Sequence, residues 1–175
     1  MEKIKAYLSG KIITSNASEA NDLYAKSSFG EPSVHNDKIQ YTVPETLFLL
    51  EKGKLDLFDI KNKIISTKQA MKKFSNIDKK INIKYPVYRD LRERGYIVKT
   101  ALKFGAEFRV YDKGAKPGKK HAKWIVYSSH ESEKFTWHDF SAKNRVAHST
   151  KKNLLLAVLD EEGDISYYEV AWKKP

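Results

Sequence analysis

The chain has 175 residues, a length that suits one large domain or two small ones. Hydrophobic residues make up 41% and aromatic residues 12%, too much for a disordered chain, and the absence of cysteine excludes disulfides and thiolate metal sites. The formal net charge of +11 makes a polyanion with phosphate groups the leading class of partner.

The first half of the chain predicts a small mixed domain. Residues 4–14 are typical of two strands joined by a serine-glycine turn, and the polar residues 15–37 include a short helical segment. Residues 43–53 predict a helix, because a proline stands in its first turn and a glycine just past its end. A second helix is expected over residues 66–74.

A polar stretch over residues 76–80 marks a domain junction, and we place the boundary near residue 82. Residues 1–82 then form an N-terminal α/β domain and residues 83–175 a second domain. The second domain opens with a helix over residues 85–95, which begins with a proline and stops at a glycine. All five arginines of the chain lie in this domain, so we expect phosphate handling there.

The rest of the second domain predicts a mixed sheet. Segments rich in β-branched and aromatic residues are typical of strands at residues 96–99, 107–111, 123–127, 154–159 and 165–170. A helix from about residue 141 to residue 150 interrupts them. This order predicts an α/β fold class, of the α+β kind, with one mixed central sheet flanked by helices.

The most informative segment is the loop between the second and third of these strands, which holds four lysines between Tyr111 and His121. Its glycines and its Pro-Gly turn let the backbone fold tightly. Tyr111, where one strand ends, and His121, where the next begins, can therefore lie at one edge of the sheet. Residue types alone leave an ordinary alternative open, in which the tyrosine is a packed ring, the histidine a surface residue and the lysines a solvated face.

Metal and nucleotide chemistry find less support. No dense carboxylate cluster marks a two-metal nuclease, and the lysine-rich loop lacks the Gly-Lys-Ser/Thr ending of a phosphate-binding loop. The remaining histidines lack the close spacing with a carboxylate found in helical zinc sites; they are His35, His130, His138 and His148.

Four motifs, in consistent order over roughly residues 80–175, resemble the catalytic domain of the tRNA-splicing endonucleases. They are Tyr88-Arg89-Asp90-Leu91-Arg92-x-Arg94-Gly95-Tyr96, Phe108-Arg109-Val110-Tyr111, Pro117-Gly118-x-x-His121-Ala122 and Arg145-Val146-Ala147-His148-Ser149-x-x-Lys152. The helix ending at residues 49–55 is similar to the N-terminal domain of the archaeal enzymes, so the whole chain resembles their short homotetrameric type. Ala101 departs from the pattern, where a glycine is expected, and this change should affect local packing rather than chemistry.

The resemblance implies a restriction-endonuclease-like fold for the second domain, with a metal-free active site made of Tyr111, His121 and Lys152. It implies a substrate as well, the bulge-helix-bulge at the exon–intron boundaries of precursor tRNA. The implied products carry a 2′,3′-cyclic phosphate and a 5′-hydroxyl. No cofactor is expected.

The chemistry of these residue types agrees with that role. Cleavage of RNA through its own 2′-hydroxyl needs a base for that hydroxyl, an acid for the departing 5′-oxygen and a cation for the charged phosphorane. Tyr111 is the candidate base, His121 the acid and Lys152 the cation. Because a free tyrosine has a pKa of about 10, the surrounding lysines would have to favour its anion.

Arg145 stands seven residues before Lys152, on the helix that leads into the Lys152 strand. In the resembled family this arginine belongs to a clamp that stacks on an unpaired bulge base. Trp172 is its candidate partner, because flat guanidinium and indole faces suit an extruded base. The alternative for Trp172 is an ordinary edge-strand aromatic ring. For His148 we expect packing or helix capping rather than a reactive role.

An acidic turn within the basic second domain predicts self-association. It contains Asp160 and Asp164, and in the resembled family an acidic loop at this place docks into a basic pocket of another subunit. A short chain with one catalytic set must self-associate to address both splice sites of an intron, which predicts a homotetramer. A solvated turn is the alternative.

Two other functions stay open. The chain can be a non-catalytic structural subunit, although an intact catalytic set argues against that, or a basic RNA-binding module that leaves hairpins whole. In each case we expect no small-molecule cofactor and no membrane, because the apolar runs are far shorter than the roughly 20 residues that span a bilayer. The first residues lack the apolar segment of a secretory signal, so residence in the cytoplasm is expected.

Overall fold

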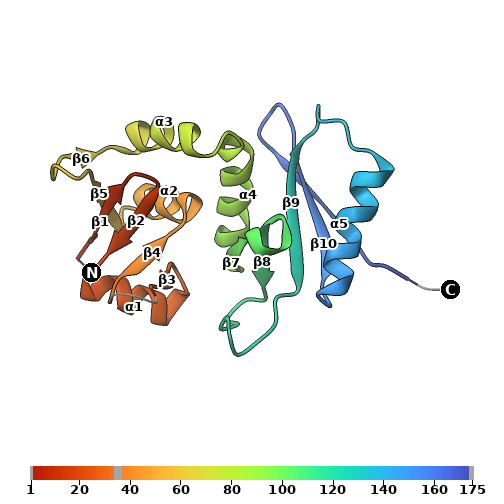
Figure 1. The fold of residues 1–175 in the computed structure, drawn as a ribbon, viewed down its shortest axis with the longest axis horizontal. Coiled ribbons are helices and arrows are strands. Elements are labelled where there is room, and N and C mark those ends of the chain that lie inside the picture. The colour runs from red at the N-terminus through yellow and green to blue at the C-terminus, as the bar shows by residue number, and fades with distance from the viewer. Residues whose placement is uncertain (1, 34–36, 174–175) are drawn as a thin grey trace. The chain divides into compact units, whose positions relative to one another are not determined.

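The computed structural model describes residues 2–33 and 37–173, and the chain divides into two compact units between Tyr85 and Pro86 (Figure 1). Helix α4 (Ile81–Glu93) runs across this division, and the domain boundary expected near residue 82 stays a prediction. His35 lies outside the described residues.

The first unit contains a mixed six-stranded sheet with the strand order β3-β4-β2-β1-β5-β6, in which β1 and β5 run parallel and the other neighbours antiparallel. The predicted pair of strands and the two predicted helices are confirmed. A short helix also lies in the polar stretch that follows the two strands. In chain order the elements are β1 (Ile4–Ser9), β2 (Ile12–Ser15), α1 (Ser18–Ser27), β3 (Glu31–Pro32), β4 (Ile39–Tyr41), α2 (Val43–Glu51), β5 (Leu55–Phe58), β6 (Ile64–Ile65) and α3 (Thr67–Ile77).

Helix α2 begins with a capping box. The Thr42 hydroxyl accepts a hydrogen bond from the Glu45 backbone N–H (3.4 Å), and the Glu45 carboxylate accepts one from the Thr42 backbone N–H (2.9 Å). The same buried carboxylate also accepts a hydrogen bond from the Gly30 N–H (3.0 Å). One side chain thus satisfies backbone donors of both the helix start and the preceding loop.

The second unit contains a mixed five-stranded sheet, which confirms the expected fold class. The strand order is β11-β10-β9-β8-β7, with β9 and β10 parallel and the other neighbours antiparallel. Helices α4 and α5 lie on opposite sides of this sheet (Figure 1). After α4 the elements are β7 (Ile97–Ala101), a 3-10 helix (Leu102–Phe104), β8 (Ala106–Tyr111), β9 (Trp124–His130), α5 (Trp137–Ser149), β10 (Asn153–Leu159) and β11 (Ile165–Val170).

The two faces of this sheet have separate cores. On the α4 face, Tyr88 packs against Phe108 with the ring centroids 5.7 Å apart. On the α5 face, Ala147 of the helix packs with Leu154 of β10 in a buried cluster. Ala101, where a glycine was expected, belongs to the same cluster, and its φ of −124° is open to any residue.

Helix α4 begins at Ile81, four residues before the predicted start, so Pro86 lies inside the helix rather than near its first residue. Asp78 explains the early start, because its carboxylate accepts a hydrogen bond from the Lys80 N–H (3.0 Å) and its carbonyl one from the Ile81 N–H (3.1 Å). The proline is tolerated at the expense of one helical hydrogen bond.

Helix α5 also begins early, at Trp137 instead of about residue 141. Thr136 and Asp139 form its capping box, in which the Asp139 N–H donates to the Thr136 hydroxyl (3.1 Å). Hydrogen bonds from Thr136 in turn hold the pKa of the Asp139 carboxyl below its ordinary value. This Thr-x-x-Asp signal is visible in the sequence, but the aromatic residues that follow it have a modest helix propensity and hide it.

A polar contact joins β11 to α4. The Tyr167 hydroxyl donates to the Asp90 carboxylate (2.7 Å), and Arg94 Nε donates to the same oxygen (2.7 Å). Burial, together with this hydrogen bond, raises the pKa of Tyr167, so the hydroxyl remains a donor. None of the helices in the described ranges has the length and apolar character needed to cross a membrane.

Candidate active site

Strands β8, β9 and β10 of the second unit have ends at one edge of the sheet, and Tyr111 and Lys152 lie at these ends. Val110 pairs with Trp124 in the antiparallel β8–β9 ladder, and Trp124 pairs with Asn153 in the parallel β9–β10 ladder. The C-terminal end of β8 and the N-terminal ends of β9 and β10 therefore coincide. Tyr111 follows Val110 and Lys152 precedes Asn153, so both residues lie at this edge of the sheet.

Tyr111 is a packed ring at the end of β8. It is only 4% exposed and contacts the buried Ala115 and Ala122, with Ile97 beside them. Arg109 lies two residues earlier on the same face, and its Cζ is 6.0 Å from the centre of the Tyr111 ring. The ring thus has apolar neighbours and a guanidinium beside it.

His121 lies in the loop, three residues before β9, and is exposed. The loop folds back by a turn in which the Lys119 N–H donates to the Lys116 carbonyl (3.0 Å), and Gly118 there has a φ of +89°, which favours glycine. The buried Ala122 anchors the residue next to His121. In the described ranges the imidazole makes no hydrogen bond or ion pair, so it is open to a substrate.

Lys152 follows α5 and is connected to it by a left-handed turn at Lys151. Lys151 has a φ of +56°, and the Lys152 N–H donates to the Ala147 carbonyl (2.9 Å), the pattern that ends helices with a left-handed residue. The Lys152 ammonium donates to the Thr150 carbonyl (2.6 Å) and lies 5.8 Å from the centre of the Phe104 ring. Burial, and then the charge of Arg109, lower the pKa of Lys152.

A pocket of about 250 Å³ opens beside this edge, on α5. Arg145 and Trp172 both line this pocket, and Trp172 follows β11, so the alternative of a ring within an edge strand does not describe it. His148 packs against the indole with the ring centroids 4.3 Å apart, which agrees with the packing role expected for it. The lining residues are Phe140, Ser141, Asn144, Arg145, His148 and Trp172.

Four of these pocket residues were not recognised as a set from the sequence. Ser141, Asn144, Arg145 and His148 follow the i, i+3, i+4, i+7 spacing of one helix face. Such a polar stripe on a helix whose opposite side packs on a sheet is the signal that could have found them. Arg109, which lies beside Tyr111, was also given no role from the sequence.

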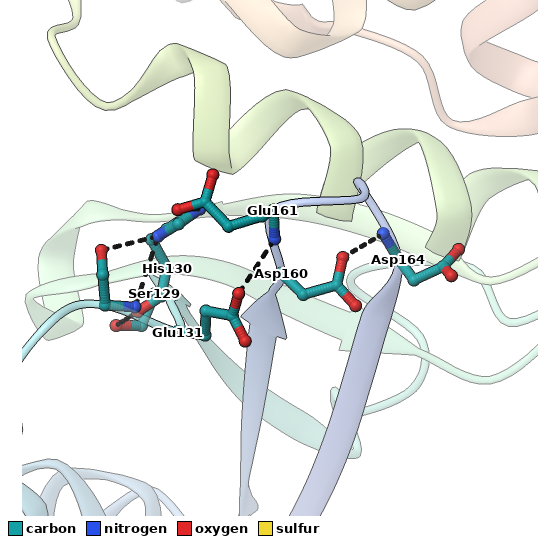
Figure 2. Close-up of polar contacts among 7 residues, drawn as sticks. Ser129, His130, Glu131, Asp160, Glu161 and Asp164 are labelled. Atoms are coloured by element: carbon teal, nitrogen blue, oxygen red, sulfur yellow. Dashed lines mark hydrogen bonds and ion pairs between the residues drawn. The ribbon is translucent and has the colours of Figure 1, made fainter.

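The opposite end of the same strands carries the acidic turn (Figure 2). Asp160 accepts a hydrogen bond from the Asp164 N–H (2.7 Å), and Glu131 accepts one from the Glu161 N–H (3.1 Å). His130 Nε2 lies 4.0 Å from the Glu161 carboxylate. Asp160 is therefore part of the turn itself, whereas the side chain of Asp164 is exposed. Among the described residues no group of three or more histidines and carboxylates is arranged to hold a metal ion.

Both units match the domains of one family. Residues 81–167 match the tRNA intron endonuclease, catalytic C-terminal domain, and residues 4–71 match its N-terminal domain. The tRNA-splicing endonuclease of Pyrococcus horikoshii is 41% identical over 172 residues, covering 98% of this chain and 97% of that protein. The enzyme of Methanothermobacter thermautotrophicus is 38% identical over 176 residues, covering 99% of each. That of Nanoarchaeum equitans is 40% identical over 153 residues, covering 84% of this chain and 97% of its own.

The chain thus contains a nuclease catalytic domain preceded by the N-terminal domain that accompanies it in its relatives. It belongs to the tRNA-splicing endonuclease family.

Proposed function

We propose that this protein cuts precursor tRNA at bulge-helix-bulge motifs, without a metal ion, and leaves a 2′,3′-cyclic phosphate and a 5′-hydroxyl. The observation that carries the proposal is the shared sheet edge, where β8 ends at Tyr111, the His121 loop enters β9, and β10 begins directly after Lys152. Three separated segments of the chain reach this edge, which supports a reaction that needs a base, an acid and a cation.

In the proposed reaction the RNA 2′-oxygen attacks the neighbouring phosphorus and the bond from phosphorus to the 5′-oxygen breaks. The Tyr111 phenolate takes the proton of the 2′-hydroxyl, and the protonated His121 imidazole gives a proton to the departing 5′-oxygen. Lys152 stabilises the extra negative charge of the phosphorane between these steps. Water restores both protonation states afterwards, so no metal and no cofactor takes part.

Arg145 and Trp172 are proposed to hold an unpaired base of the bulge. Their pocket is concave and offers a guanidinium and a half-exposed indole, the planar groups on which splayed RNA bases stack. Because the pocket lies on α5, the helix that leads into Lys152, a base bound there would fix the register of the scissile phosphate.

The assembly is proposed to be a homotetramer. One chain carries one catalytic set, while an intron has two splice sites, and the exposed acidic turn suits a basic pocket on a second copy. Within that turn Asp164 is the stronger candidate for the contact, because the Asp160 carboxylate already accepts a backbone hydrogen bond. Residence in the cytoplasm, where precursor tRNA is met, belongs to the same proposal.

The test is direct. The purified chain is incubated with an intron-containing tRNA precursor in excess EDTA, and the products are resolved on a gel and their ends analysed. We expect two cuts per intron, with cyclic-phosphate ends. Binding without cutting would favour a structural subunit or a simple RNA-binding module, and activity that vanishes in EDTA and returns with Mg²⁺ would overturn the mechanism.

A further inference from the structure

Strand register brings Arg109 to the same face of the sheet as the proposed catalytic residues. Arg109 and Tyr111 are two residues apart in β8, so their side chains share one face. Arg109 pairs with Ile125 of β9, which pairs with Leu154 of β10, and Lys152 stands two residues before Leu154. The side chains of Arg109, Tyr111 and Lys152 thus gather on the face that α5 covers.

The contacts agree with the register. The guanidinium carbon of Arg109 lies 6.0 Å from the centre of the Tyr111 ring, within reach of a cation–π contact, and Arg109 Nε is buried. The ring of Phe104, over which the Lys152 ammonium lies, packs against the core on this same face. Arg109 therefore touches the candidate base and faces the region of the candidate cation.

Lys152 has no carboxylate partner in the described ranges. Its ammonium donates to a backbone carbonyl, and burial, followed by the like charge of Arg109, lowers its pKa. Two cations beside each other are unfavourable unless an anion joins them. A phosphate oxygen is the anion that the proposed reaction supplies.

We propose that Arg109 is a positioning residue of the active site, whose guanidinium supports the Tyr111 ring and holds Lys152 ready for the anionic phosphate. This inference rests on the proposed function. Arg109 acts through its two neighbours: its charge favours the phenolate of Tyr111, and its repulsion of the Lys152 ammonium is relieved when a phosphate anion binds beside them.

The pKa of Lys152 offers a readout that a merely structural arginine would not change. Burial, and after it the charge of Arg109, lower this pKa. Removal of the guanidinium therefore raises the pKa of Lys152, and the ammonium is retained to higher pH. Other charged groups face this region, Lys99 of β7, Glu107 of β8 and Lys143 of α5, and all of them stay in every variant.

The first experiment needs no RNA. The protein is treated briefly with acetic anhydride over a range of pH, and acetylation of Lys152 is measured by fragment mass spectrometry, with the exposed neighbour Lys151 as the internal reference. In Arg109→Met the midpoint for Lys152 should rise by about half a pH unit or more relative to wild type. Arg109→Lys, which keeps the charge, should stay near wild type.

The matched control is Arg92→Met, which removes an arginine from α4 on the opposite face of the sheet and should leave the Lys152 midpoint unchanged. If Arg109→Met does not fold, Arg109→Gln replaces it. An unchanged midpoint in the folded neutral variant overturns the proposal, whatever happens to activity.

The second experiment measures cleavage of the precursor against pH. Arg109→Met should lower kcat by about tenfold or more, with little change in KM, and should shift the alkaline limb of the profile to higher pH. Arg109→Lys should recover most of kcat. If the wild type does not cut at all, the proposed function fails while the acetylation result still decides the link between Arg109 and Lys152. A loss of kcat with an unmoved alkaline limb counts against the positioning role.

Discussion

The two ends of the parallel pair β9 and β10 carry opposite charge and handle it differently. At one end, beside the paired Trp124 and Asn153, the guanidinium of Arg109 lies beside Tyr111, and its charge lowers the pKa of Lys152 after burial does. At the other end, beside His130 and Leu159, the carboxylates of the acidic turn accept hydrogen bonds from its own backbone (Figure 2). The carboxylate of Asp160 is engaged within the turn, whereas the Lys152 ammonium donates only to a backbone carbonyl in the described ranges.

This difference predicts where substitutions act on chemistry and where they act on assembly. The largest effect is expected at the cationic end. His121→Ala should lower kcat by about 10²–10⁴-fold, the usual range for a positioned acid or base. A substrate whose 5′-bridging oxygen is replaced by sulfur has a far better leaving group, so it should restore much of that rate.

The control is the cleavage rate of the same sulfur-containing substrate by variants of the other two residues. Tyr111→Phe and Lys152→Ala should not be rescued to the same degree, because activation of the 2′-hydroxyl and stabilisation of the phosphorane remain unassisted. Equal rescue of all three variants, or rescue of Tyr111→Phe alone, would show that His121 is not the acid.

The next largest effect is expected at the pocket on α5. Arg145→Ala and Trp172→Ala should each reduce cutting of bulged RNA by about tenfold to a hundredfold, because stacking of one base is worth about 1–3 kcal/mol. Trp137→Ala is the matched control, since this tryptophan is exposed on the same helix but does not line the pocket. Unchanged turnover in both pocket variants would show that neither residue contributes to the clamp.

A smaller effect, on assembly, is expected at the acidic end. Reversal of Asp160 and Asp164 to lysine should dissociate tetramers into dimers in sedimentation experiments. Because Asp160 also accepts the hydrogen bond of the turn, Asp164→Lys alone distinguishes a loss of the subunit contact from a disturbance of the turn itself. Asp22→Lys reverses an exposed acid of the first unit and should leave assembly unchanged. A wild-type monomer would refute the tetramer.

The smallest effect is expected where β11 is tied to α4. Tyr167→Phe removes the hydrogen bond to Asp90 and should lower the free energy of unfolding by about 1 kcal/mol, measured by urea titration. Cutting at saturating substrate should not change, because this contact lies on the face opposite to α5. A loss of kcat without a loss of stability would mean that the two faces are coupled.

Much of the fold was predictable because its signals are local. The strands of the second domain are rich in β-branched and aromatic residues, and α2 has its proline and its glycine at the expected ends. The short strands β3 to β6 were not predicted, since two to four residues hold too little pattern and these strands depend on pairing with neighbouring strands of the sheet. The starts of α4 and α5 were missed because side-chain caps at Asp78 and Thr136, rather than propensity, decide them.

For the candidate site, the sequence by itself determined the family and the identity of the proposed catalytic residues, because four motifs in one order are a property of the chain alone. Only the tertiary structure decided which of these residues are neighbours. Tyr111 and Lys152 are far apart in the chain and lie at the same edge of the sheet because β9 pairs with both of their strands. The contact of Arg109 with the Tyr111 ring, the packing of His148 on Trp172 and the turn role of Asp160 depend on register and distance, which act through space and leave no local trace in the sequence.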